Sequence, residues 1–123
     1  MDNKEYKRQL IKKAYKFSLN IISFIDSLEK KDYSVQVISK QLLRSATSIG
    51  ANIVEAQAAS SKRDFINFLN HALKSGNETK FWLGLLRDSK KSDRDRSNIL
   101  LKNAEYLSKI LGSSLLELRN KKL

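Results

Sequence analysis

Residues 35–59, VQVISKQLLRSATSIGANIVEAQAA, decide the fold. Apolar side chains recur in this stretch at steps of three and four residues: Val35, Ile38, Leu42, Ala46, Ile49 and Ile53. Such steps gather the side chains on one stripe of an α-helix, whereas a β-strand would alternate apolar and polar residues. The stretch therefore predicts a long helix with one buried side.

Three further stretches follow the same period, at about residues 2–28, 62–87 and 93–120. Their stripes are Leu10, Ala14, Phe17, Ile21, Phe24 and Leu28, then Phe65, Leu69, Ala72, Gly76, Thr79, Leu83 and Leu86, and then Leu100, Ala104, Leu107, Leu111, Ser114 and Leu118. The chain contains no Pro and four Gly, so helix breakers are rare. Four amphipathic helices are therefore expected.

Short polar segments separate the four stretches, at residues 29–34, 60–61 and 88–93. Ser61 and Asp64 fit a capping box, and either Ser92 or Asp93 is suited to cap the last helix. Long helices joined by short connections pack as antiparallel neighbours. The sequence thus predicts an all-α fold, an antiparallel up-down-up-down four-helix bundle that forms a single domain over residues 1–123.

Several kinds of chemistry are excluded by composition. There is no Cys and one His, His71, so disulfides, thiol catalysis and His-rich metal sites are ruled out. Gly76, Gly84 and Gly112 lie apart inside helical stretches, and none belongs to a phosphate-binding loop. We expect no metal and no cofactor.

A polar stripe runs along the second helix. Arg44, Ser48, Asn52 and Glu55 share one of its faces, and Glu78 lies on the next helix. Catalysis would require a pocket where these side chains converge, and no nucleophile is tied to a base by spacing. We therefore interpret the stripe as structural or as part of an interface, with Arg44 paired to Glu55 or Glu78, and we predict no enzyme active site.

Net charge suggests an acidic partner. Lys and Arg number 24 against 13 acidic residues, a formal charge of +11, which favours nucleic acid, an anionic membrane or an acidic protein, unless it serves solubility alone. The candidate contacts for DNA or RNA are Lys4, Arg8, Lys12, Lys102, Lys109, Arg119, Lys121 and Lys122, on the first and fourth helices and the tail. Adjacent helices would merge these residues into one surface that binds phosphates without reading sequence.

The longest apolar stretch, residues 17–28, is interrupted by Asn20 and Asp26 and is too short to span a bilayer. No targeting segment is visible either. The sequence therefore predicts a cytoplasmic protein without a membrane partner.

A second apolar line accompanies the core stripe on two helices. It comprises Ile11, Tyr15, Ile22 and Ile25 on the first helix and Ile99, Tyr106 and Ile110 on the fourth. A wide core-facing arc would explain it, and so would a subunit interface. Small residues of the second helix, Gly50 among them, would let another backbone come close. We expect a homo-oligomer.

One segment resembles a known family. It comprises residues 43–55 (LRSATSIGANIVE), residues 64–69 (DFINFL), residues 72–75 (ALKS), Glu78 and Trp82. These motifs, about a third of the chain, are similar to bacterial four-helix bundle proteins encoded in intervening sequences of large-subunit ribosomal RNA genes. They are similar also to accessory variability determinant proteins of diversity-generating retroelements. The resemblance implies a four-helix bundle and a ring-shaped homo-oligomer, typically a pentamer. For the retroelement branch it implies nucleic-acid binding beside a partner reverse transcriptase.

Overall fold

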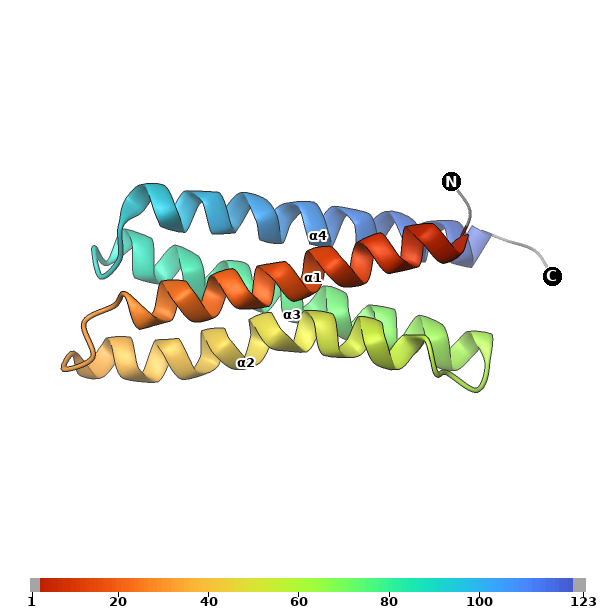
Figure 1. Cartoon of the computed structure of the whole chain (residues 1–123), viewed down its shortest axis with the longest axis horizontal. Helices are drawn as coiled ribbons and strands as arrows, with labels where there is room; N and C mark the ends of the chain where they lie inside the picture. Colours follow the sequence, from red (N-terminus) through yellow and green to blue (C-terminus); the bar gives the residue numbers. More distant parts are fainter. Residues whose placement is uncertain (1–2, 121–123) are drawn as a thin grey trace.

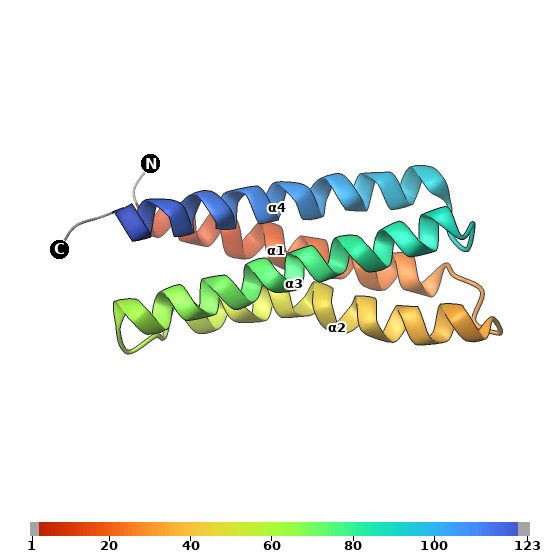
Figure 2. The same cartoon turned by 180° about the vertical axis from the view of Figure 1, so that it is seen from behind.

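The computed structural model describes residues 3–120 as four α-helices: α1 (Asn3–Asp26), α2 (Tyr33–Ala56), α3 (Lys62–Asp88) and α4 (Arg94–Asn120). Within this range no β-strand occurs. Figures 1 and 2 show neighbouring helices running antiparallel, with α1 beginning and α4 ending at the same end of the bundle. The predicted all-α, up-down-up-down bundle is confirmed.

Capping sets the helix ends, which differ from the expected ones by at most three residues. α2 begins at Tyr33, not Val35, because the Asp32 carboxylate accepts the Val35 N–H at 3.2 Å and so caps the helix. α2 ends at Ala56, before the expected Ala59. There the N–H groups of residues 57–59 turn to carbonyls three residues back, which tightens the last turn.

The caps of α3 and α4 lie where the sequence places them. The Ser61 hydroxyl accepts the Asp64 N–H at 3.0 Å. The Asp64 carboxylate in turn accepts the backbone N–H and the hydroxyl of Ser60, one residue before the expected partner. At α4 the cap is Asp93, not Ser92, because its carboxylate accepts the Arg96 N–H at 2.9 Å.

The core lies where the four stripes meet, and its largest fully buried apolar side chains are Phe24, Ile21, Leu42, Ile49, Ile53, Leu83, Leu86, Leu107 and Leu111. Four positions of the predicted stripes are only half-buried: Ile38, Phe65, Ser114 and Leu118. On α4 the stripe continues through Leu115, which is buried, because Ser114 turns toward α1 and its hydroxyl lies 3.3 Å from that of Tyr6. On α2 Ser39 is buried and Ile38 packs half-buried against the core.

Small side chains allow the helices to approach closely. α2 and α3 form the most extensive helix pair, and between them the Thr79 and Ser45 hydroxyls are buried and hydrogen-bonded at 2.9 Å. On α3, Gly76 faces α4, where an added Cβ would come within 2.7 Å of the Ser108 hydroxyl. That hydroxyl is buried and makes no hydrogen bond within residues 3–120.

Two polar bridges tie together the end of the bundle opposite the α2–α3 loop. The Lys91 ammonium donates to the Asp32 carboxylate at 2.6 Å and joins the α1–α2 loop to the α3–α4 loop. This hydrogen bond, with the Val35 N–H, holds the pKa of Asp32 below its ordinary value. Arg87 donates to Asn98 on α4 at 2.8 Å, and its hydrogen bonds to Asp88 lower the pKa of that carboxyl.

Because Gly76 lies close to α4, replacing it should change stability differently from replacing Gly84, which has open space around it. Gly84→Ala should raise the free energy of unfolding by about 1 kcal/mol, because no atom lies within 4 Å of the added Cβ. Gly76→Ala should raise the free energy of unfolding by less, or lower it, because the Ser108 hydroxyl must move. Gly76→Ala combined with Ser108→Ala should recover the gain. Urea unfolding measures all three, and equal stability of Gly76→Ala and Gly84→Ala would contradict the packing.

The bridge at Asp32 should make stability depend on pH. Its folded-state pKa lies below the ordinary 3.8, so the pair stabilises the fold above that value and loses its effect as the pH falls through the folded pKa. Asp32→Asn is the matched variant, because Asn also caps helices but carries no charge. The wild type should melt higher than this variant at about pH 7, and the difference should vanish toward about pH 2. A difference that stays constant would count against the bridge.

Candidate nucleic-acid interface

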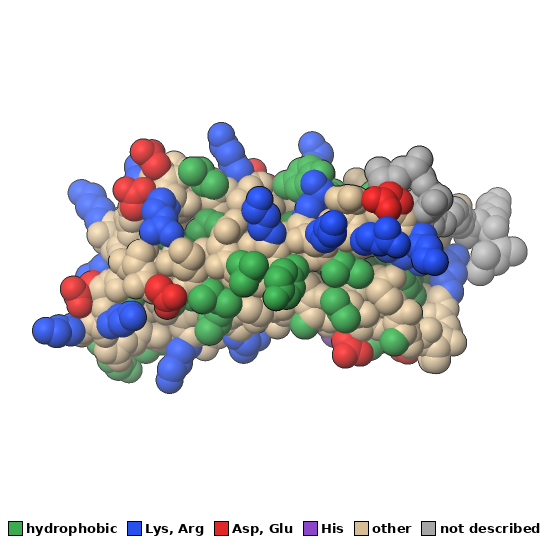
Figure 3. Space-filling view, in the orientation of Figure 1, with side chains coloured by type: hydrophobic (Ala, Val, Ile, Leu, Met, Phe, Trp, Pro, Cys, Tyr) green, Lys and Arg blue, Asp and Glu red, His purple; other side chains and the backbone are tan. Residues whose placement is uncertain are grey.

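The N-terminal half of α1 is the most basic part of the bundle. It carries Lys4, Lys7, Arg8, Lys12 and Lys13, and Lys16 follows just past the middle of the helix. Up to Lys16, Glu5 is the one acidic residue of this helix, and it forms an ion pair with Arg8 at 3.3 Å. Figure 3 shows Lys and Arg side chains gathered along α1 and α4 on one face of the molecule. This half of α1 therefore presents a strongly positive surface.

The predicted contacts fall into three groups. Lys4, Arg8 and Lys12 on α1, with Lys102 and Lys109 on α4, are exposed. Arg119 is exposed too, but its guanidinium donates to Asn70 on α3 at 3.3 Å, which directs it away from α1. Lys121 and Lys122 lie outside the described residues.

Most of these lysines have no carboxylate to neutralise them. Within residues 3–120, ion pairs are formed by Arg8, Arg44, Arg87 and Lys91. The lysines of α1 and α4 that form none there are Lys4, Lys7, Lys12, Lys13, Lys16, Lys102 and Lys109. An unpaired ammonium exposed to water is free to bind an anion.

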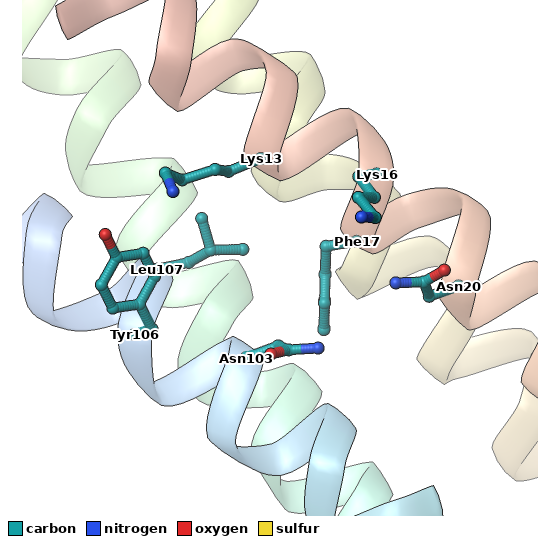
Figure 4. A pocket seen from close by; sticks show the side chains of 7 residues that line it. All are labelled: Lys13, Lys16, Phe17, Asn20, Asn103, Tyr106 and Leu107. Carbon is teal, nitrogen blue, oxygen red and sulfur yellow. The ribbon is translucent and has the colours of Figure 1, made fainter.

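A groove runs between α1 and α4, the least extensive helix pair of the bundle. Its central hollow, of about 370 Å³, is shown in Figure 4. Lys13, Lys16, Phe17 and Asn20 line it from α1, and Asn103, Tyr106 and Leu107 line it from α4. The Lys13 ammonium lies 5.3 Å from the centre of the Tyr106 ring. The groove therefore combines cations, amides and an aromatic ring.

Sequence reasoning did not single out the groove residues Lys13, Lys16 and Arg96. Arg96 lies in α4 and lines the groove near Asn20. A signal was present, because Lys13, Lys16 and Asn20 follow each other at helical steps beside the core stripe. The sequence shows on which side of α1 these residues lie, but it does not show that a groove lies between α1 and α4.

The polar stripe of α2 joins α3 at one point. The Arg44 guanidinium donates to the Glu78 carboxylate at 2.5 Å, and the Trp82 indole N–H donates to the same carboxylate oxygen at 3.0 Å. The Asn52 amide instead donates to the Ser48 carbonyl of its own helix, and Glu55 forms no ion pair within residues 3–120. The stripe therefore does not converge on a common space.

Neither a metal site nor a membrane span is found in the described part of the chain. Among residues 3–120, no group of three or more His, Asp or Glu side chains could hold a metal ion. None of the four described helices is long and apolar enough to cross a membrane.

The second apolar line divides between the core and the surface. Ile11 and Ile25 pack against the core, and so does Ile110, whereas Tyr15 is 67% exposed and Ile22 is 43% exposed. With Leu19 these two form what we call the α1 patch, part of the hydrophobic band in the middle of Figure 3. On α4, Ile99 and Tyr106 are exposed.

Another apolar surface lies on α3 beside the Arg44–Glu78 ion pair. Phe81 is 59% exposed, and its ring meets that of Trp82 edge to face at 5.1 Å. Leu85, one turn on, is also exposed. We call Phe81, Trp82 and Leu85 the α3 patch. The described residues thus include one apolar patch on α1 and a different one on α3.

Comparison with known proteins identifies the family. The family model described as 23S rRNA-intervening sequence protein matches residues 6–113. A crystal structure of a protein with unknown function from the S23 ribosomal protein family, from Bacteroides thetaiotaomicron VPI-5482, is 41% identical; the match covers 86% of this chain and 97% of that one, with a TM-score of 0.80. No curated protein matches the chain. The chain therefore belongs to the 23S rRNA-intervening sequence protein family, as its motifs predict.

Proposed function

We propose that the chain is a non-enzymatic, nucleic-acid-binding protein that acts as a homo-oligomer. The observation that carries the proposal is the set of exposed, unpaired lysines on α1 and α4, including Lys4, Lys12, Lys102 and Lys109. With a formal charge of +11 on the chain, this surface suits a polyanion. Phosphate groups of DNA or RNA are the anions that we propose it binds.

Binding through lysines would not depend on base sequence. A lysine ammonium is a point charge on a flexible stem and contacts phosphate oxygens, whereas bases are read by groups of fixed geometry. Phosphate contacts release counterions, so affinity would fall steeply as salt rises. Electrostatic, sequence-independent binding follows from this surface.

The α1 and α3 patches support self-association. Exposed apolar side chains such as Leu19 and Phe81 are normally covered when they gather in a patch. A closed ring needs two different patches on each subunit, one meeting the other. We propose a ring, most simply a pentamer, whose five copies would carry a formal charge of about +55 and bind nucleic acid with avidity.

The resemblance to the retroelement proteins suggests a partner enzyme. We propose a nucleic-acid enzyme such as a reverse transcriptase, because it and the oligomer would hold the same strand. The alternative function is a protein-interaction scaffold, which the exposed Phe81 ring favours. In that case the positive charge serves solubility or an acidic protein partner.

Charge reversal on α4 tests nucleic-acid binding. Lys102→Glu with Lys109→Glu should weaken binding of all duplex sequences about equally. It should also flatten the slope of log affinity against log salt by about 0.9 for each phosphate that the protein no longer neutralises. Fluorescence anisotropy measures both quantities.

The control is Lys40→Glu with Lys74→Glu, which makes the same charge change at exposed positions of α2 and α3. It should alter the slope much less. If the wild type binds neither DNA nor RNA at low salt, the nucleic-acid function is wrong and the scaffold function takes its place.

Charges placed in the apolar patches test the ring. Leu19→Glu and Phe81→Glu should each reduce the mass in light scattering from that of an oligomer to the 14.1 kDa of one chain. Because each variant keeps one intact patch, an equimolar mixture should form a dimer of about 28 kDa through the remaining pair of patches. A wild type that elutes as a 14.1 kDa monomer at micromolar concentration would refute self-association.

A further inference from the structure

The groove between α1 and α4 is continuous along much of the bundle. The central hollow shares Asn20 and Asn103 with a hollow at one end, and Lys13 and Tyr106 with a hollow of about 410 Å³ at the other. Together they run from Glu5 to Ser23 of α1, about 27 Å at 1.5 Å per residue. At the ~3.4 Å rise of stacked bases, this length holds about eight nucleotides.

The lining of the groove is arranged in layers. Apolar side chains form its floor, among them Phe17, Leu10 and Leu107, all of which are buried. The cations lining it are Lys13, Lys16 and Arg96, and Glu5 is the one acidic residue among the described residues that line the three hollows. The balance of charge in the groove therefore favours an anionic chain.

Two further groups in the groove suit nucleotide bases. Tyr106 is 51% exposed, so part of its ring is open to stacking. The amides of Asn20 and Asn103 lie on opposite walls, and each can both donate and accept hydrogen bonds (Figure 4). A ring and two amides can hold any base, because every base has an aromatic face and a polar edge.

The shape of the groove selects a single strand over a duplex. Packed helices have axes about 8–10 Å apart, so a hollow between two of them has the width of one chain. A duplex keeps its base faces stacked inside and would meet only the outer lysines. A single strand can place its phosphates at Lys13 and Lys16 and turn a base toward Tyr106.

We propose that the α1–α4 groove binds single-stranded nucleic acid, with phosphates on Lys13 and Lys16 and a base stacked on Tyr106. This inference rests on the proposed function and adds to it the form of the nucleic acid and the place where it binds. The Lys13 ammonium, 5.3 Å from the Tyr106 ring, brings a phosphate contact and a base contact to the same point.

The test measures anisotropy with a fluorescent, unstructured oligonucleotide of about 20 residues and with a duplex of the same length. Tyr106→Leu should weaken single-strand binding about five- to a hundredfold, because it removes the ring on which a base stacks, without changing the salt slope. Tyr106→Phe keeps the ring and should bind like the wild type. Lys13→Gln with Lys16→Gln should flatten the single-strand slope by about 1.4.

Lys40→Gln with Lys74→Gln is the matched control, because it removes the same charge from exposed positions of α2 and α3. On the single strand it should weaken binding less than the Lys13 and Lys16 pair does, and thermal unfolding should show all variants folded. A wild type that binds no nucleic acid overturns the proposed function itself. Binding that survives Tyr106→Leu unchanged, or that depends equally on both lysine pairs, overturns the groove alone.

Discussion

The close packing of α2 against α3 is the constraint on which the rest of the bundle depends. Its centre is the buried hydrogen bond between Thr79 and Ser45, which fixes the height of one helix against the other. Polar groups are tolerated in a core when they are hydrogen-bonded. A shift along the helix would break this bond and leave each hydroxyl with only a carbonyl of its own helix, that of Leu42 for Ser45 and that of Ser75 for Thr79. At the surface, the Arg44–Glu78 ion pair joins α2 and α3 in the same register.

Close approaches also occur between α1 and α2 and between α3 and α4, whereas the side between α1 and α4 is open. α1 meets α2 where Ala14 faces Gly50, and α3 meets α4 where Gly76 faces Ser108. Between α1 and α4 larger side chains border the groove, among them Phe17 and Tyr106. Large residues at this one seam thus accompany both the loose packing and the groove.

Helical periodicity accounts for how much of the fold was predictable. The four apolar stripes predicted four helices. The short connections predicted that consecutive helices are antiparallel neighbours. Helix ends depended on particular caps such as Asp32, which the stripe does not encode. The choice between Leu115 and Ser114 depended on the Tyr6 hydroxyl, because steps of three and four are equally compatible with a helix.

The site was less predictable than the fold, because the period of apolar residues along the chain does not give the distances between helices. Arg44 had two candidate partners, and the geometry chose Glu78 because Glu55 lies 11 residues along the same helix, about 16 Å away. Exposed lysines such as Lys102 could be placed on outer faces from angle alone. The groove residues could not, because the sizes of side chains facing each other across the seam decide whether a groove exists.

Positive charge and apolar surface occur together on α1, and this bears on how assembly and binding would interact. On the proposed function, a ring brings together subunits that each carry +11, so repulsion opposes the contact between the α1 and α3 patches. A bound polyanion neutralises that repulsion and strengthens the ring. By linkage the ring must then strengthen binding of the polyanion by the same free energy. Self-association and nucleic-acid binding would therefore be one coupled equilibrium.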